Sequence, residues 1–203
     1  MKDPHFKKIY NKQVLKKLAK RYGPVLYHHV EMSISTEVML NVVKKMDKKN
    51  PRRGEAVMVI PNSAGQVWLH TKSFYPTGVY RLMTGGLDPG EDAVQALKRE
   101  ALEETGFTTE IDRCLAVVTY NLANGVGRYP FVSFVFLTKP VEGIPSPIDN
   151  SETIDDFKAV PVEELFETAR QLRRLDGDFA DWGCFRAVTH ELAAQALHLD
   201  QKG

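Results

Sequence analysis

The sequence predicts an α+β protein in which helices pack on a mixed β-sheet. Several short apolar segments typical of strands lie between residues 56 and 160. Segments with apolar residues at helical spacing precede, interrupt and follow these strands. Strands and helices do not alternate regularly, and this irregular order argues against a doubly wound parallel sheet.

The N-terminal quarter differs in charge from the rest of the chain. Of the 203 residues, 43% are hydrophobic and 26% charged, as in a soluble globular protein, and the formal net charge is +1. Residues 1–53 contain 14 Lys/Arg and 4 Asp/Glu, whereas residues 54–203 contain 13 and 22. Such a basic arm is typical of a docking surface for an anion, for nucleic acid or for the acidic body itself. A solvated helical face would have the same composition.

The basic arm is predicted to be mainly helical. Apolar residues at positions 14, 15, 18, 19 and 22 form a helical stripe that ends at Gly23-Pro24. Residues 25–30 favour a strand, and a second helix is predicted from Ser35 to about Asp47. The polar segment 48–54 is the expected boundary, which divides the chain into an N-terminal extension, 1–53, and a main domain, 54–203, that includes the C-terminal helices.

The main domain begins with strands and ends with helices. The run 56–60 is expected to be a strand buried on both faces, with 66–71 returning beside it as a hairpin. The remaining predicted elements are strands at 110–121, 131–138 and 157–160 and helices at 162–172 and 182–197.

Cysteine usage and hydropathy point to the cytoplasm. Cys114 and Cys184 stand alone among apolar residues, so we expect core thiols in place of a zinc site or a disulfide. The sequence shows no apolar signal core and no apolar run near ~18 residues. We therefore expect a soluble cytoplasmic protein without a membrane segment.

The densest group of chemically capable residues is GGLDPGEDAVQALKREALEETGF, residues 85–107. Asp92 is a suitable helix N-cap, Gln95 completes a capping box, and Gly106 suits a left-handed C-terminal cap. These signals predict a helix at 93–105. At about 100° per residue, Glu100, Glu103 and Glu104 share one face of that helix.

Three carboxylates on one face repel one another, and a divalent cation removes the conflict. Oxygen ligands favour Mg²⁺ or Mn²⁺, and Mg²⁺ held by few carboxylates completes its shell with water and substrate phosphates. Arg99 precedes Glu103 by four residues and is expected to orient it. Glu91 can reach back to Arg99, and Gly85-Gly86 allows close backbone approach. The segment REALEE alone is more typical of a solvated helix than of a metal site. The glycines, the caps and Glu91, all in register with it, favour the metal site.

The spacing of Gly85, Glu91, Arg99, Glu100, Glu103, Glu104, Gly106 and Phe107 resembles the Nudix box, the signature of Nudix hydrolases. The resemblance extends less specifically over residues 54–170. It implies an α/β/α sandwich around a mixed sheet, and Mg²⁺-dependent hydrolysis of a nucleoside diphosphate linked to another moiety. Two departures are Ala101, where a bulkier aliphatic is usual, and Met83-Thr84 before the glycines, where many relatives have proline.

The resemblance also implies roles for single residues. Glu100, Glu103 and Glu104 would bind metal together with the Gly85 carbonyl, and either Glu100 or Glu104 would activate water with Arg99 in support. Glu152 occupies the place of a late-loop carboxylate that serves as a base or ligand in some relatives. A variant, Glu152→Gln, with full activity at saturating Mg²⁺ would remove it from the mechanism.

Substrate specificity is less marked in the sequence. Arg81 and Arg128 are candidate phosphate contacts, and Tyr120 is a candidate for stacking on a base. An ADP-ribose-like substrate is expected first and a nucleoside triphosphate second. The alternatives are an RNA cap hydrolase and a regulatory module that binds nucleotide or nucleic acid through the basic arm. Residues 1–50 are also candidates for a homodimer contact or a wall of the substrate site.

Overall fold

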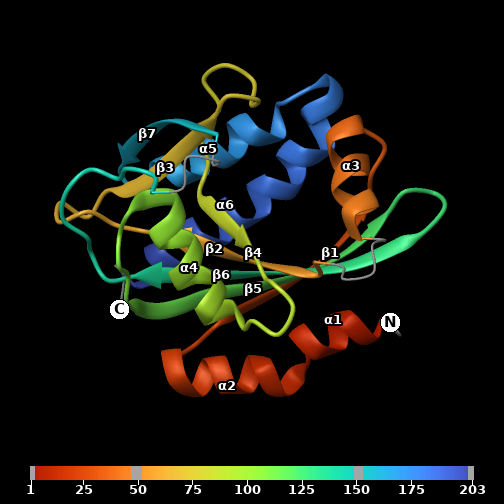
Figure 1. Ribbon diagram of the computed structural model, residues 1–203, viewed down its shortest axis with the longest axis horizontal. Helices are drawn as coiled ribbons and strands as arrows, with labels where there is room; N and C mark the ends of the chain where they lie inside the picture. Colours follow the sequence, from red (N-terminus) through yellow and green to blue (C-terminus); the bar gives the residue numbers. More distant parts are fainter. Residues whose placement is uncertain (1–2, 47–51, 149–152, 201–203) are drawn as a thin grey trace.

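The computed structural model describes residues 3–46, 52–148 and 153–200 (Figure 1). None of the helices in these ranges is both long and apolar enough to cross a bilayer. The helices are α1 Pro4–Ile9, α2 Lys12–Tyr22, α3 Glu37–Met46, α4 Ala93–Thr105, α5 Glu164–Arg173 and α6 Ala180–Asp200, with a short 3₁₀ turn at Gly177–Phe179. The strands are β1 Leu26–Ser33, β2 Gly54–Val59, β3 Val67–Lys72, β4 Met83–Gly86, β5 Ile111–Ala123, β6 Arg128–Thr138 and β7 Ile154–Val160.

The main sheet has five strands in the order β1-β5-β6-β2-β4. Strand β5 pairs with β6 and β2 with β4 in antiparallel fashion, whereas β1/β5 and β2/β6 are parallel pairs. The sheet is therefore mixed, which confirms the α+β prediction. A second sheet contains β3 and β7 in antiparallel order.

Helices cover both faces of the main sheet, as Figure 1 shows. On one face, Phe6 of α1 and Leu97 of α4 pack in one cluster with Phe134 of β6. On the opposite face, Phe185 of α6 packs with Met39 of α3, and Leu165 of α5 lies in a neighbouring cluster. This three-layer arrangement confirms the predicted sandwich and places α4 beside the edge strand β4.

The prediction that 56–60 and 66–71 pair as a hairpin is wrong, because the two segments contact each other only at the turn between them. At this turn, Pro61 bridges Val67 and the Trp68 amide donates to the Ile60 carbonyl at 2.9 Å. Strand β2 is already paired on one side with β6 and on the other with β4. Because both edges of β2 are taken, β3 turns away and pairs with β7.

Strand β1 comes from the basic N-terminal region and lies in the main sheet. Its eight residues pair in parallel with β5, from Leu26 opposite Ala116 to Ser33 opposite Ala123. Residues 1–53 thus contribute a sheet strand as well as helices α1–α3. Residues 48–51 of the expected linker, 48–54, lie outside the described residues.

Candidate active site

The position of α4 is fixed at both ends by local hydrogen bonds. The Asp92 carboxylate accepts from the amides of Val94 and Gln95 at 2.9 Å each, and the Gln95 side chain accepts from the Asp92 amide at 2.9 Å. At the other end, Gly106 has φ +73° and its amide donates to the Leu102 carbonyl at 2.9 Å. The predicted caps and the bounds Ala93–Thr105 are confirmed.

The three predicted carboxylates lie on the side of α4 that faces β4 and β3. Glu100 and Glu104 are only 7% and 1% exposed, whereas the Glu103 side chain is 40% exposed. A Cβ atom at Gly85 would stand 1.9 Å from Cγ of Glu100. Only glycine therefore allows the β4 backbone to lie this close to the glutamate.

Arg99 connects the carboxylates to the loop before the helix. Its Nη1 donates to Glu100 at 2.8 Å and to Glu103 at 3.0 Å. Its Nε and Nη2 donate to the two oxygens of Glu91 at 3.0 and 2.9 Å, and Nη2 also donates to the Gly86 carbonyl at 3.1 Å. The expected pairing with Glu103 is present, but it is one of several contacts that hold the guanidinium in place.

Glu91 is the main partner of Arg99. Hydrogen bonds from Arg99 hold the pKa of the Glu91 carboxyl below its usual range, against the opposing effect of burial. Glu91 also accepts from the Asp88 amide at 3.0 Å. The loop 88–91 and the first carboxylate of α4 are thereby tied to one cation, so the geometry of the loop depends on that ion pair.

Lys72 is a site residue that the sequence did not indicate. Its Nζ lies 3.0 Å from Oε1 of Glu104, with the two side chains 12% and 1% exposed. Lys72 ends β3, which is far from α4 in the sequence and reaches it only because β3 lies in the second sheet. A single lysine at the end of a strand carries no signal that would have identified this contact.

The donor chemistry of this cluster fits Mg²⁺ or Mn²⁺. Hard carboxylate oxygens are the ligands that these ions prefer. Because Gly85 has no Cβ, its backbone lies directly beside the Glu100 side chain. Within the described ranges, no three Asp, Glu, His or Cys side chains converge on a common point as they stand. In the described structure, Arg99 balances the charge of Glu100 and Glu103, and Lys72 balances that of Glu104.

Arg81 lies close to the glycine turn but is nearly buried, with 4% exposure. Its Nε donates to the Tyr75 hydroxyl at 2.8 Å, and its Nη1 donates to the Leu82 carbonyl at 2.6 Å and to the Thr84 hydroxyl at 3.1 Å. Backbone hydrogen bonds join Arg81 to His70 of β3. The guanidinium is thus held beside the turn that carries Gly85.

The structure does not bring the other two predicted substrate residues to the turn. Tyr120 is 0% exposed, and its ring centroid lies 4.6 Å from that of Phe185 in the core. It therefore has no free face for a base, because its position on β5 is covered by α6.

Arg128 starts β6, and its Nη1 lies 3.5 Å from Glu31 of β1. Since β1 and β4 are opposite edges of the sheet, this pair is remote from Gly85. Glu152 lies outside the described residues.

A family comparison agrees with this geometry. The NUDIX domain model matches residues 51–183, well over half of the chain. The chain belongs to the NUDIX family. The matched range contains Gly85, the whole of α4 and Lys72, whereas α1, α2, β1 and α3 precede it.

Solved NUDIX relatives share the fold at low sequence identity. The MutT protein from Methanosarcina mazei Go1 has 16% identity and a TM-score of 0.50, over 76% of this chain and 99% of that one. A NUDIX hydrolase from Nitrosomonas europaea has 19% identity and the same TM-score of 0.50, over 75% of this chain and 90% of that one. Both likenesses concern the fold alone.

A curated relative is more similar in sequence over a shorter range. An RNA pyrophosphohydrolase from Brucella ovis is 36% identical over 66 residues, which is 29% of this chain and 37% of that protein. The match thus spans little more than a third of the relative's length.

Proposed function

We propose that this NUDIX protein is a Mg²⁺-dependent pyrophosphohydrolase, which cleaves a nucleoside diphosphate linked to another moiety by attack of water on phosphorus. The observation that carries the proposal is the grouping of Glu100, Glu103 and Glu104 on α4. Arg99 pairs with Glu100 and Glu103, Lys72 pairs with Glu104, and Glu100 is pressed against Gly85. Three carboxylates held this close favour a divalent ion and a phosphorylated substrate.

The three glutamates would hold the ion, with the Gly85 carbonyl as a proposed further ligand. Bound there, Mg²⁺ (or Mn²⁺) would offset the charge of the diphosphate and lower the pKa of the attacking water. Either Glu100 or Glu104 would accept the proton of that water, and Glu152 is proposed as an additional base or ligand. The proton acceptor must stand within hydrogen-bond reach of the water, which the fixed ends of α4 favour.

Two cations are placed to assist. Arg99 orients Glu100 and Glu103, and it holds the loop 88–91 in place. Lys72 lies against Glu104, so it would be released toward a substrate phosphate when an ion takes its place. Arg81 was a candidate phosphate contact, but because its guanidinium is nearly buried, it is proposed to act by stabilising the glycine turn through Thr84.

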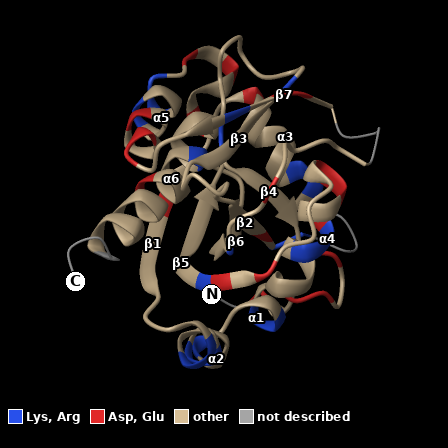
Figure 2. Cartoon of the chain, turned by 90° about the vertical axis from the view of Figure 1, so that its left-hand side faces the viewer, with Lys and Arg blue, Asp and Glu red and all other residues tan. Residues whose placement is uncertain are grey.

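Two substrate classes are proposed, in order of preference. An ADP-ribose-like nucleoside diphosphate derivative is the first candidate, as the sequence suggests. The end of an RNA is the second, because the sequence likeness is to an RNA pyrophosphohydrolase and because Lys and Arg gather on α2 (Figure 2). A protein that only binds nucleotide or RNA is the rival from a different class.

A product assay separates these candidates. Purified protein is incubated with ADP-ribose, a dinucleoside polyphosphate, a nucleoside triphosphate, 5′-triphosphate RNA and capped RNA, each with Mg²⁺ or with EDTA. We expect Mg²⁺-dependent release of a nucleoside monophosphate or pyrophosphate from one class, and loss of release in Glu104→Gln. Absence of turnover on every substrate, together with salt-sensitive RNA binding, would favour the binding module.

A further inference from the structure

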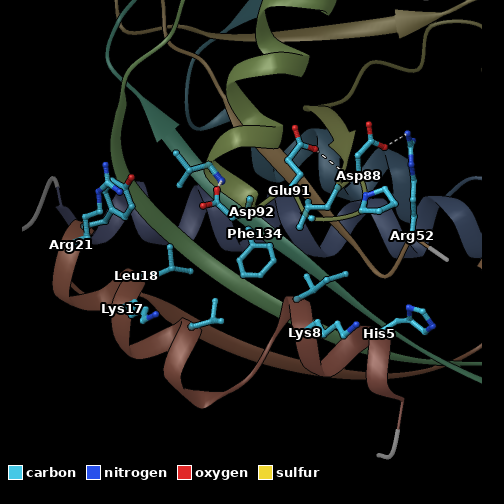
Figure 3. A pocket seen from close by; sticks show the side chains of 18 residues that line it. His5, Lys8, Lys17, Leu18, Arg21, Arg52, Asp88, Glu91, Asp92 and Phe134 are labelled. Atoms are coloured by element: carbon cyan, nitrogen blue, oxygen red, sulfur yellow. Dashed lines mark hydrogen bonds and ion pairs between the residues drawn. The ribbon is translucent and has the colours of Figure 1, made fainter. Parts of the chain in front are cut away.

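A cavity of about 690 Å³ lies between the N-terminal helices and the start of α4 (Figure 3). Helices α1 and α2 form one wall, and the loop 87–92 with the first turn of α4 forms the other. The α1/α2 wall precedes the range matched by the NUDIX domain, 51–183. The cavity is therefore made jointly by the family domain and by a part of this chain outside it.

The cavity is separate from the carboxylate cluster. It touches α4 at Ala93 and Val94, whereas Glu100 lies about 10 Å further along the helix axis from Ala93. The two places meet at Glu91, which lines the cavity and also pairs with Arg99 at 2.9 Å. A molecule in the cavity would therefore sit beside the first turn of α4, about two turns of helix before Glu100.

The α1/α2 wall carries positive charge that the described part of the protein leaves uncompensated. Lys8, Lys17 and Arg21 line this wall, and no described carboxylate forms an ion pair with any of them. Two of the acidic residues opposite have cation partners of their own, one of which, Arg52, also lines the cavity. Asp88 pairs with Arg52 at 2.8 Å and Glu91 pairs with Arg99. The excess of cations favours an anionic occupant.

The floor between the two walls is apolar and aromatic. Phe134 of β6 lies at its centre with Leu18 of α2 beside it, to the left in Figure 3. Tyr22 also lines the cavity, and its ring lies 5.1 Å from the guanidinium carbon of Arg21. A ligand with a flat aromatic ring would bury the apolar surface of that ring against this floor. An anionic group attached to the ring would reach Arg21.

The acidic wall distinguishes a nucleotide from a lipid-like anion. The carboxylates of Asp88 and Asp92 border the cavity. They are poor neighbours for a hydrocarbon chain, because burying a carboxylate against it costs hydration, but they accept hydrogen bonds from sugar hydroxyls. A volume of about 690 Å³ lies within the range of small-molecule sites, roughly 300–1,000 Å³.

We propose that this cavity is a second binding site, which takes a nucleoside phosphate. Lys17, Arg21 and Lys8 meet the phosphate, the base lies on the apolar floor against Tyr22, and Asp88 and Asp92 accept from the ribose. Binding there does not require a metal ion or the hydrolytic reaction, so the site is independent of the proposed function.

The test is calorimetric titration of AMP into the full-length protein in EDTA, which keeps divalent ions away from the glutamates. The variant Lys17→Ala/Arg21→Ala is compared with Lys16→Ala/Lys20→Ala, a pair with the same spacing on α2 that does not line the cavity. We expect AMP to bind at least about tenfold more weakly to the first variant, and within about twofold of wild type to the second. Unchanged melting temperatures in both variants would show that the fold is intact.

Four results would overturn the proposal. Equal weakening in both double variants would mean that the arm attracts anions without a defined site, and no binding to wild type would leave the cavity without this ligand. Inorganic phosphate or dodecyl phosphate binding as tightly as AMP would remove the nucleoside from the proposal. In EDTA, Glu104→Gln should bind AMP like wild type, since a loss of binding there would place AMP at the glutamates. Loss of hydrolysis alone would concern only the proposed function.

Discussion

The ammonium of Lys72 lies 3.0 Å from the carboxylate of Glu104, which is the most buried of the three glutamates on α4. The pair joins the end of β3 in the small sheet to the last turn of α4. A carboxylate with 1% exposure is stable in ionised form only beside a compensating cation. In the described structure, Lys72 contributes that positive charge. In the proposed function, a metal ion contributes it instead.

The effect of replacing Lys72 on protein stability should therefore depend on whether a metal ion is present. In EDTA, Lys72→Met should lower the free energy of unfolding by about 3 kcal/mol, because one partner of a buried ion pair is removed. With saturating Mg²⁺ the loss should be smaller, since the ion takes over the charge. Denaturant unfolding under both conditions measures the difference.

An exposed ion pair is the matched control. Lys139 lies 2.6 Å from Glu110, and both side chains are more than half exposed, at 62% and 69%. Lys139→Met should leave stability unchanged with or without Mg²⁺, because solvent screens such pairs. If Lys72→Met lost the same stability in EDTA and in Mg²⁺, the ion would not replace the lysine at Glu104.

The glycine turn offers a second prediction. Gly85→Ala places a Cβ 1.9 Å from Cγ of Glu100, so either the strand or the glutamate must move. We expect kcat/KM to fall at least about 100-fold, near 2.7 kcal/mol of transition-state stabilisation. Gly86→Ala is the neighbouring control, because its nearest contact, at 2.9 Å, is the mobile end of Arg52. Equal effects of both substitutions would show that the contact with Glu100 is not decisive.

The Arg99–Glu91 pair predicts a pH dependence of stability. Arg99 lowers the pKa of Glu91 from its ordinary value of 4.5, so the folded state binds this proton less readily than the unfolded chain. The stability that Glu91 contributes is fully present above pH 4.5 and is lost as pH falls through the lowered folded pKa. The difference in unfolding free energy between wild type and Glu91→Gln should shrink accordingly in acid. A difference that grew toward low pH would contradict the assignment.

The burial of Tyr120 predicts a structural phenotype in place of a binding defect. Tyr120→Ala should cost roughly 3–5 kcal/mol of stability through the cavity it leaves beside Phe185. The KM of the folded fraction should stay close to that of wild type. Phe74→Ala, at a position 60% exposed, should leave stability unchanged. A raised KM with unchanged stability in Tyr120→Ala would restore Tyr120 as a substrate contact.

Features set by neighbouring residues were predictable from the sequence. The bounds of α4 follow from the Asp92–Gln95 capping box and from Gly106, which act within one turn of helix. The ion pair of Arg99 with Glu103 follows from a spacing of four residues on the same helix. The mixed α+β class likewise follows from local apolar patterns.

Features set by distant pairing were not predictable in the same way. The partner of β3 is β7, because β2 already has a neighbour on each side, and no local pattern records that fact. Lys72 reaches Glu104 only through this placement of β3. Tyr120 was expected near a substrate for its chemistry alone, whereas its exposure depends on where α6 packs.

Binding of Mn²⁺, followed by electron paramagnetic resonance and compared with turnover at the same ion concentrations, tests the central claim most directly. If the glutamates of α4 hold the catalytic ion, wild type will bind Mn²⁺ saturably and turn over in proportion to occupancy. Glu104→Gln will then bind the ion at least about tenfold more weakly and lose activity. Equal Mn²⁺ binding by wild type and Glu104→Gln, or turnover that persists in EDTA, would contradict the account.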